Sequence, residues 1–235
     1  MTQTVARCMA AVETRSFAAH MSVNVAKLVT LRDDPELRRV VDECEIINAD
    51  GQGVVWASKL LGDPLPERVA GIDLMHRLFA EAEQRDHSVY ILGARSEVLQ
   101  QAVERLRAEH PALRFAGWRD GYFDASEEAS VAETIRDAQP DLLFVAMSSP
   151  RKEYFLGRHG TTMGVPFVMG VGGAIDVVSG MTRRAPHRWQ RLGLEWLFRL
   201  LQEPRRMLRR YATTNARFLW ILSREMVSRR APRLR

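Results

Sequence analysis

Asp50 is a candidate catalytic base. It follows a short apolar run in the segment 46–53, IINADGQG, where we expect a strand to end and a helix to begin. Ligands of α/β sheets bind at this end of the strands, and a carboxylate acting there as general base typically contributes about 10²–10⁴ in rate. Gly51 and Gly53 leave room for a bulky substrate. An Asp here is also a common helix N-cap, and the spacing alone leaves both interpretations open.

A glycine-rich segment, GVGGAID at 170–176, follows the last apolar run and could let the backbone approach phosphates or a sugar ring. It is not the G-x-G-x-x-G fingerprint, so it does not indicate a dinucleotide. Besides Gly172 and Gly173 it contains Asp176, which either binds sugar or ribose hydroxyls or caps the next helix. A second turn, LGARS at 92–96, is either an anion site at a helix N-terminus or simply a tight turn.

Three arginines near the C-terminus could hold a diphosphate. Arg199, Arg206 and Arg209 are spaced by seven and three residues, so in one continuous helix they would share a face. Each charge-assisted hydrogen bond to a phosphate would contribute on the order of 1.5–3 kcal/mol. Pro204 interrupts that helix, and a trio at this spacing is also expected by chance in so Arg-rich a tail.

The sequence offers no readable metal site. Its six histidines and two cysteines lack metal-ligand spacing. Because G-x-S-x-G and Walker A segments are both absent, the chain is neither a typical α/β-hydrolase nor a P-loop NTPase. Two cysteines favour a reducing compartment, and without an 18-residue apolar run or a signal-peptide core we expect a cytoplasmic protein that starts out soluble.

The elements that must position these residues alternate from residue 16 to about residue 178. Short β-rich runs are separated by helical ones, which is typical of a parallel sheet flanked by helices. The predicted strands are 17–23, 45–48, 88–92, 114–118, 141–146 and 165–171. The clearest helices are 96–110 and 126–138, each opening with a Ser cap. The expected fold class is α/β, Rossmann-like, with a mostly parallel sheet.

After Pro186 the pattern becomes purely helical. Leu and Trp recur at helical spacing in 189–202, and Glu203-Pro204 interrupts the helix and starts a second one. We therefore expect two helices or one kinked helix. The predicted domains are an α/β catalytic domain, 1–188, and a basic amphipathic helical appendage, 189–235, which we expect to close over the active site when the chain docks on lipid.

The charge is concentrated in that appendage. Residues 183–235 contain 15 Arg and three Glu, a local charge of +12, whereas the whole chain carries only +5. Such a block indicates a polyanionic partner: nucleic acid, an anionic membrane surface or a phosphorylated substrate. Aromatic and aliphatic residues interleaved with Arg suit a bilayer interface, where each basic residue contributes roughly 1 kcal/mol. A helical pair packed on the domain with solvated Arg is the alternative.

Several segments together resemble the WecG/TagA/CpsF family of glycosyltransferases. They are INADGQGVVW at 47–56, ERVAGID at 67–73, GYF at 121–123, SSPRKE at 148–153, GVGGAIDVVSG at 170–180, RAP at 184–186, GLEWLFRL at 193–200 and EPRR at 203–206. The resemblance extends over roughly residues 16 to 220. It implies an inverting enzyme that moves a sugar from a UDP-sugar to a saccharide on a polyprenyl diphosphate, at the inner face of the cytoplasmic membrane.

This resemblance also implies the setting and the partners. Cell-surface polysaccharide assembly is the process, and the donor carries N-acetylmannosamine, its uronic acid or a glucose-type sugar. No metal or other cofactor is implied, and a homo-oligomer in solution is possible within the family. An anionic membrane surface is the expected third partner, and nucleic acid is not expected, because the first 182 residues carry a net negative charge.

Carried over position by position, the family's base falls on Asp50, and Ser22 replaces the Thr usually found near it, which keeps the hydroxyl. Arg199, Arg206 and Arg209 match arginines that engage the donor diphosphate. The other expected substrate-binding residues are Asn24, Arg68, Gly121, Tyr122, Lys152, Gly172, Gly173 and Asp176.

One position departs from the family pattern. Where the family usually has Pro-Lys-Gln-Glu, this chain has Pro150-Arg151-Lys152-Glu153, so an ammonium replaces an amide. A cation there would favour an anionic partner, such as a uronic acid or a phosphate. The main alternative function is a non-catalytic protein that binds a nucleotide or nucleic acid through its arginines. A nicotinamide-dependent oxidoreductase lacks its fingerprint here.

Overall fold

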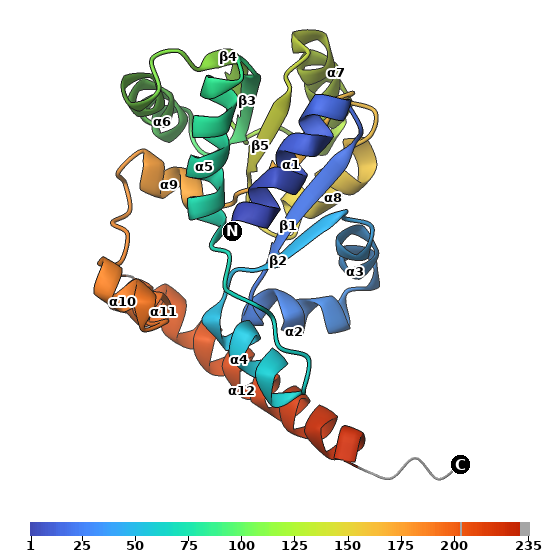
Figure 1. Cartoon of the computed structure of the whole chain (residues 1–235), viewed down its shortest axis with the longest axis vertical. Helices are drawn as coiled ribbons and strands as arrows, with labels where there is room; N and C mark the ends of the chain where they lie inside the picture. The colour runs from blue at the N-terminus through green and yellow to red at the C-terminus, as the bar shows by residue number, and fades with distance from the viewer. Residues whose placement is uncertain (203, 231–235) are drawn as a thin grey trace. The chain divides into compact units, whose positions relative to one another are not determined.

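The chain folds into two compact units, each assembled from separate stretches of sequence (Figure 1). The first comprises residues 1–22, 36–48 and 70–183, and the second comprises 23–35, 49–69 and 184–235. The structure, a computed structural model, describes residues 1–202 and 204–230, without the side chains of residues 187, 191, 199, 206, 207, 209, 210, 229 and 230. The second unit therefore combines C-terminal helices with two segments from the N-terminal third of the chain.

Six strands form a parallel sheet in the order β2-β1-β6-β5-β3-β4. Their bounds are Ala18–Val23 for β1, Ile46–Ala49 for β2, Ser88–Gly93 for β3, Arg114–Arg119 for β4, Leu142–Ala146 for β5 and Phe167–Gly170 for β6. Gly93 pairs with Ala146 in register, so β3 and β5 finish side by side. The α/β fold class is confirmed, and each of the six predicted strands is present within a few residues of its expected place.

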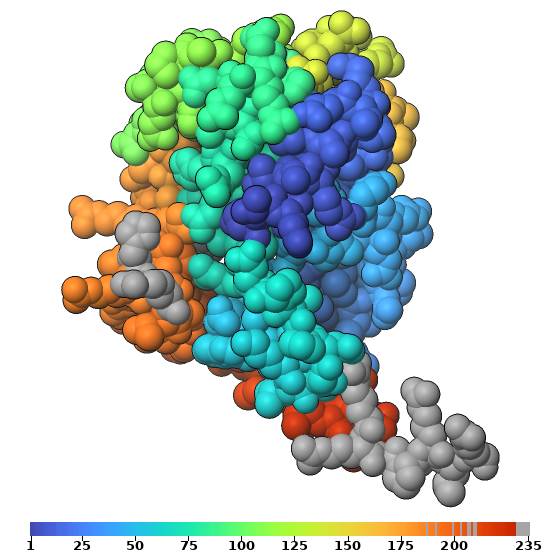
Figure 2. All heavy atoms as spheres, viewed as in Figure 1, coloured from blue at the N-terminus to red at the C-terminus, as the bar shows by residue number. Residues whose placement is uncertain are grey.

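The core of the first unit lies between the inner strands and the helices that cover them. β3, β5 and β6 are buried along their whole length, as expected for a parallel sheet covered on both faces. The helices α1 (Thr2–Thr14) and α5 (Gly71–Gln84) pack on each other, and their side chains form a continuous surface in Figure 2. Phe79 of α5 contacts Phe144 of β5, with ring centroids 4.5 Å apart.

The remaining helices of this unit connect the strands. They are α3 (Pro35–Asp42), α6 (Ser96–Glu109), the 3₁₀ turn η1 (Ala125–Glu127), α7 (Glu128–Ala138), α8 (Arg151–His159) and α9 (Ala174–Val178). The predicted Ser caps are wrong. Ser96 is already helical, because the N-cap of α6 is Arg95, and η1 before α7 opens with a capping box formed by Asp124 and Glu127.

The second unit contains only helices and connecting loops. They are α2 (Val25–Asp33), α4 (Gln52–Leu60), α10 (His187–Arg191), α11 (Glu195–Gln202) and α12 (Pro204–Arg230), and α12 packs along α2. The expected continuous helix over 189–202 is wrong, because Gly193 interrupts it with φ +71°. A Cβ on Gly193 would lie 2.7 Å from Cγ of Gln52, so glycine is required where this turn meets α4.

Candidate active site

Asp50 lies between β2 and α4, as the sequence analysis predicts. Its N–H donates to the carbonyl oxygen of Val23 at 3.0 Å, which fixes the backbone where β2 ends. The N-cap of α4 is Gly51, so the interpretation of Asp50 as the helix N-cap is wrong. The side chain is half-buried and lines a pocket, which is the environment that a general base needs.

That pocket lies entirely within the second unit and has a volume of about 470 Å³. It falls in the size range of ordinary small-molecule sites. Its lining residues come from α2, α4, the loop after α4, and the C-terminal helices: Asn24, Val25, Ala26, Asp50, Gly51, Gln52, Gly53, Trp56, Ala57, Leu60, Arg68, Gly193, Glu195, Trp196, Tyr211, Thr214, Asn215, Phe218, Leu219 and Leu222. Three predicted site residues, Asn24, Asp50 and Arg68, are thus brought together.

Asn24 also has a structural role. Its Oδ1 accepts a hydrogen bond from the N–H of Lys27 at 3.0 Å and caps α2. A Cβ on Gly51 would lie 3.4 Å from Cβ of Asn24, so the start of α2 and the residue after Asp50 are in close contact. The cap uses the single oxygen of the side-chain amide, and Asn24 also lines the pocket.

Arg68 is held by Glu195, which lies in the segment GLEWLFRL and for which the sequence predicted no role. A guanidinium nitrogen of Arg68 donates to Oε2 of Glu195, and both side chains are mostly buried. The other oxygen of Glu195 lies 3.7 Å from Nε of Arg184. Glu195 is the first residue of α11 and therefore joins two guanidinium groups at the start of the C-terminal helices.

The three arginines predicted to hold the donor diphosphate are placed only by their backbones. Arg199 lies on α11, whereas Arg206 and Arg209 lie on α12. They do not share one continuous helix, because α11 ends at Gln202 and α12 begins at Pro204, as the interruption at Pro204 predicted. Their side chains lie outside the described part of the chain.

In the first unit, further predicted residues follow the ends of the strands. Gly93 ends β3 with φ +125°, and a Cβ on it would lie 2.5 Å from the backbone carbon of Ala146. A Cβ on Gly121 would in turn lie 3.0 Å from Cα of Gly93. The turns after β3 and β4 are thus packed backbone against backbone, which only glycine permits.

The loop after β4 is held by Arg151, which the sequence analysis did not single out for this role. One of its nitrogens donates to the carbonyl oxygen of Gly121 at 2.8 Å, and another donates to that of Phe123. Its guanidinium lies over the Phe123 ring, 4.6 Å from the centroid. Tyr122, between these two residues, is 71% exposed and is therefore available to a ligand.

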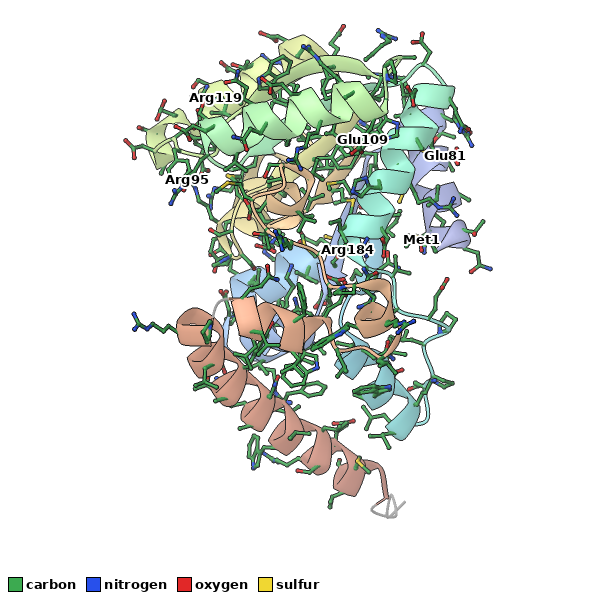
Figure 3. All side chains as sticks on the ribbon, turned by 90° about the vertical axis from the view of Figure 1, so that its left-hand side faces the viewer. Met1, Glu81, Arg95, Glu109, Arg119 and Arg184 are labelled. Atoms are coloured by element: carbon green, nitrogen blue, oxygen red, sulfur yellow. The ribbon has the colours of Figure 1, made fainter. Side chains whose placement is uncertain are left out.

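Arg95, Tyr122 and Asp176 form a polar cluster at these strand ends. A hydrogen bond with Tyr122, reinforced by the charges of Glu97 and Asp176, raises the pKa of the Arg95 guanidinium above its ordinary value. Figure 3 shows Arg95 at the end of α6 opposite Glu109. The cluster combines a fixed cation, an exposed phenol and a carboxylate, which suits a ligand that carries both phosphates and hydroxyls.

The glycine loop after β6 lies against Lys152. Gly172 adopts φ +52°, and its N–H and that of Val171 both donate to the carbonyl oxygen of Val145, at 3.3 and 2.9 Å. A Cβ on Gly170 would lie 3.0 Å from Cε of Lys152, so this side chain fills the space beneath the loop.

The ammonium of Lys152 is 2.8 Å from a carboxylate oxygen of Glu153, and both side chains are buried. This ion pair balances the positive charge that replaces the family's usual amide. Gly173 is the N-cap of α9, so the interpretation of Asp176 as a helix cap is wrong. The carboxylate of Asp176 instead folds back toward Gly173, whose Cβ, if present, would lie 3.3 Å from it.

Ser22 is the penultimate residue of β1 and belongs to the first unit. Its Oγ is buried and makes no hydrogen bond to any residue that the structure describes. A Cβ on Gly71 would lie 3.1 Å from this oxygen, so glycine at the start of α5 leaves space next to the hydroxyl.

The described residues contain neither a cluster of metal ligands nor a helix that could span a membrane. Across 1–202 and 204–230, His, Cys, Asp and Glu form no group of three or more that could hold a metal ion. Within the same ranges, every helix is too short or too polar to cross a bilayer, including the 27-residue α12.

Comparison with known proteins supports the resemblance seen in the sequence. Residues 1–232 match the model of the glycosyl transferase WecG/TagA/CpsF family. An N-acetylglucosaminyldiphosphoundecaprenol N-acetyl-beta-D-mannosaminyltransferase from Bacillus spizizenii is 37% identical over 176 residues, which are 75% of this chain and 68% of the relative. The family match covers both compact units and therefore includes the pocket beside Asp50.

Proposed function

The chain belongs to the WecG/TagA/CpsF family of glycosyl transferases, and on that basis we propose that it moves a sugar from a UDP-sugar to a saccharide linked to a polyprenyl diphosphate, with inversion. The name of the Bacillus relative specifies transfer of N-acetylmannosamine to N-acetylglucosaminyldiphosphoundecaprenol. N-acetylmannosamine, its uronic acid and a glucose-type sugar are the donors to test. Membership of a family of transferases argues against the non-catalytic alternative.

The observation that carries this proposal is the position of Asp50. It follows a strand end, it is not the N-cap of the next helix, and it lines a pocket of about 470 Å³ that also contains Arg68. A carboxylate that removes a proton must stand within hydrogen-bond reach of the acceptor hydroxyl, and a pocket of this size can admit one.

The proposed reaction forms one bond and breaks one. Asp50 accepts the proton of the acceptor hydroxyl as its oxygen attacks the anomeric carbon. The bond between this carbon and the UDP oxygen breaks on the opposite face, and its electron pair leaves with UDP. The products are the inverted glycoside, UDP and a proton held by Asp50, which returns to solvent. We assign Ser22 to the base's surroundings by resemblance alone.

The negative charge that develops on the departing diphosphate must be stabilised by positively charged groups. We assign this role to Arg199, Arg206 and Arg209, because guanidinium groups placed in advance stabilise developing charge most in the transition state. By resemblance alone, we also assign Tyr122, Lys152, Gly172, Gly173 and Asp176 to substrate binding. No metal is required in this scheme, because the arginines supply the cationic charge.

We further propose that the second unit docks on an anionic membrane surface from its cytoplasmic side. Leu208 and Val227 of α12 are exposed, and the helix is rich in arginine. Apolar side chains beside guanidinium groups suit the headgroup region, where roughly 1 kcal/mol per basic residue accumulates. Sedimentation with phosphatidylglycerol vesicles and with neutral vesicles tests this assignment, and equal binding to both would contradict it.

A UDP-release assay tests the reaction. The protein is incubated with each candidate UDP-sugar, with and without N-acetylglucosaminyl-diphosphoprenol as acceptor. We expect release with one donor only when the acceptor is present, and a product of inverted anomeric configuration by NMR. No turnover with any donor, or release that does not depend on the acceptor, would contradict the proposal.

A further inference from the structure

The pocket beside Asp50 has an unusual lining for a site that binds only sugars and phosphates. Several large apolar side chains gather around it and remain largely exposed: Trp56 at 51%, Leu60 at 61%, Trp196 at 43% and Leu219 at 62%. Single exposed apolar residues are ordinary, but a group of them around one cavity marks a binding site for an apolar ligand. A carbohydrate ligand alone would leave the aliphatic side chains of Leu60 and Leu219 without a matching partner.

The character of the lining changes along α4. Asp50 precedes the helix, and Gln52 and Gly53 form its first turn, whereas Trp56 and Leu60 line the pocket farther along. At 1.5 Å per residue, Trp56 and Leu60 lie about 9 and 15 Å from Asp50 along the helix axis. The carboxylate and the apolar side chains therefore occupy different stretches of the same wall.

The facing wall, α12, changes in the same way. Tyr211, Thr214 and Asn215 line the pocket first, and Phe218 and Leu222 line it one to three turns later. Tyr211, Asn215, Phe218 and Leu222 lie three or four residues apart, so they form one stripe on the helix, with Thr214 beside it. In Figures 1 and 3 α4 and α12 run in the same general direction, so their apolar parts lie at the same end of the pocket.

We propose that this apolar end, formed by Trp56, Leu60 and Leu219 with their neighbours, binds the isoprene units next to the diphosphate of the acceptor. The inference rests on the proposed function and deepens it. The acceptor joins an apolar chain to a charged diphosphate and a saccharide, and the pocket passes from apolar side chains to Asp50 in the same order. The first part of the lipid thus leaves the bilayer and enters the protein, which sets the depth at which the acceptor hydroxyl reaches the base.

A comparison of acceptors tests this inference in detergent-free buffer. The saccharide diphosphate carries either a short prenyl chain or a methyl group, and the KM of each acceptor is measured. We expect the prenyl acceptor to have the lower KM. Trp56→Ala should raise its KM by about tenfold or more while leaving the KM of the methyl acceptor unchanged. Trp56 is half-exposed, so its replacement should not unfold the chain.

Trp118→Ala is the matched control. Trp118 has the same side chain, is 41% exposed, lies on β4 in the first unit and is not among the residues that line the pocket. We expect this variant to keep the wild-type KM for both acceptors. Equal KM values for the two acceptors in the wild type, or equal losses in the two variants, would overturn the inference.

A second readout needs no turnover. A prenyl diphosphate with a photoreactive group on its chain is crosslinked to the full-length protein, and the labelled peptides are identified. We expect labels on pocket-lining residues within 52–60 and 211–222. Labels confined to Leu208, Trp220 and Val227, the large apolar residues of α12 that are exposed outside the pocket lining, would mean that lipid meets only the helix surface and would overturn the inference. If UDP release fails with every donor while these labels appear, the proposed reaction fails and the prenyl site stands.

Discussion

Arg68 and Glu195 form a mostly buried ion pair although 127 residues separate them in the sequence. Arg68 follows α4, and Glu195 begins α11, so the pair ties the wall that carries Asp50 to the C-terminal helices. Nε of Arg184 lies 3.7 Å from the second oxygen of Glu195. The carboxylate of Glu195 therefore fixes the orientation of Arg68 at the pocket and balances part of the local positive charge.

We expect Glu195→Gln to lower the free energy of unfolding by about 1–3 kcal/mol, because it leaves the Arg68 guanidinium mostly buried without its counter-charge. Urea titration of Glu195→Gln, Arg68→Gln and the double variant gives a double-mutant cycle, with an expected coupling energy of about 0.5–3 kcal/mol. The KM for the UDP-sugar should also rise in both single variants, because Arg68 loses its orientation. Strictly additive effects would show that the pair has no energetic role.

Asp33 and Arg217 provide the control for this cycle. They form a two-pronged ion pair between α2 and α12 at 2.7 and 2.9 Å, and both side chains are about half exposed. Asp33→Asn also removes a contact of the C-terminal helix but touches no polar group of the pocket. We expect it to change stability less than Glu195→Gln and to leave the KM for the donor unchanged.

Asp50→Asn tests the proposed base. The amide keeps the shape of the side chain but cannot accept the proton, so turnover should fall by about 10²–10⁴ while donor affinity changes little. Donor binding is followed by calorimetry and turnover by UDP release. Asp63→Asn, an exposed aspartate of the same unit outside the pocket lining, should behave as the wild type. Turnover of Asp50→Asn within a few-fold of the wild type would remove this residue from the role of base.

Local sequence patterns predicted the strands well, because buried parallel strands are continuous apolar runs. They also predicted that Asp50 follows a strand end, since Ile46 and the helix after Gly51 are both evident locally. The helix N-caps were predicted less well. Ser96 and Ser126 resemble helix starts, yet Arg95 and Asp124 precede them, because the packing of the strand-end turns decides where each helix begins.

The contacts that build the site could not be predicted in this way. Glu195 meets Arg68, and Arg151 holds the carbonyl of Gly121, only because the fold brings distant segments together. Gly193 is a residue type that often ends helices, but its contact with Gln52, which requires glycine at this turn, is visible only in the tertiary structure. Residue types and their spacing identify candidate site residues, whereas their hydrogen-bond and ion-pair partners can be identified only from the tertiary structure.

Asp141 should make the first unit sensitive to acid. Burial raises the pKa of this carboxyl, but hydrogen bonds from the N–H and hydroxyl of Ser88, at 2.8 and 3.0 Å, and the nearby His87 and Arg15 outweigh it, so the pKa is lowered from 3.8. A lowered pKa in the folded state means that the stabilisation is present above pH 3.8 and is lost as the pH falls below it.

Asp141→Asn should therefore lower the free energy of unfolding at pH 7 by about 1–2 kcal/mol, since the hydrogen bonds involve a partly solvated charged group. Below pH 3.8 the variant and the wild type should converge. Urea midpoints measured across this range check both statements. A constant difference at every pH would mean that the carboxylate charge is not what stabilises the pairing of β3 and β5.

Gly93→Ala should destabilise the protein more than the substitution of a glycine that has positive φ but open surroundings. Its φ of +125° is nearly exclusive to glycine, and a Cβ there would lie 2.5 Å from the backbone of Ala146, which cannot move without breaking the pairing of two central strands. Gly62→Ala is the matched control, because its φ is +84° with no atom within 4 Å of the new Cβ. We expect about 1–2 kcal/mol for the control, from backbone strain alone, and at least about 3 kcal/mol for Gly93→Ala. Equal losses in urea titrations of the two variants would show that the strand ends can separate.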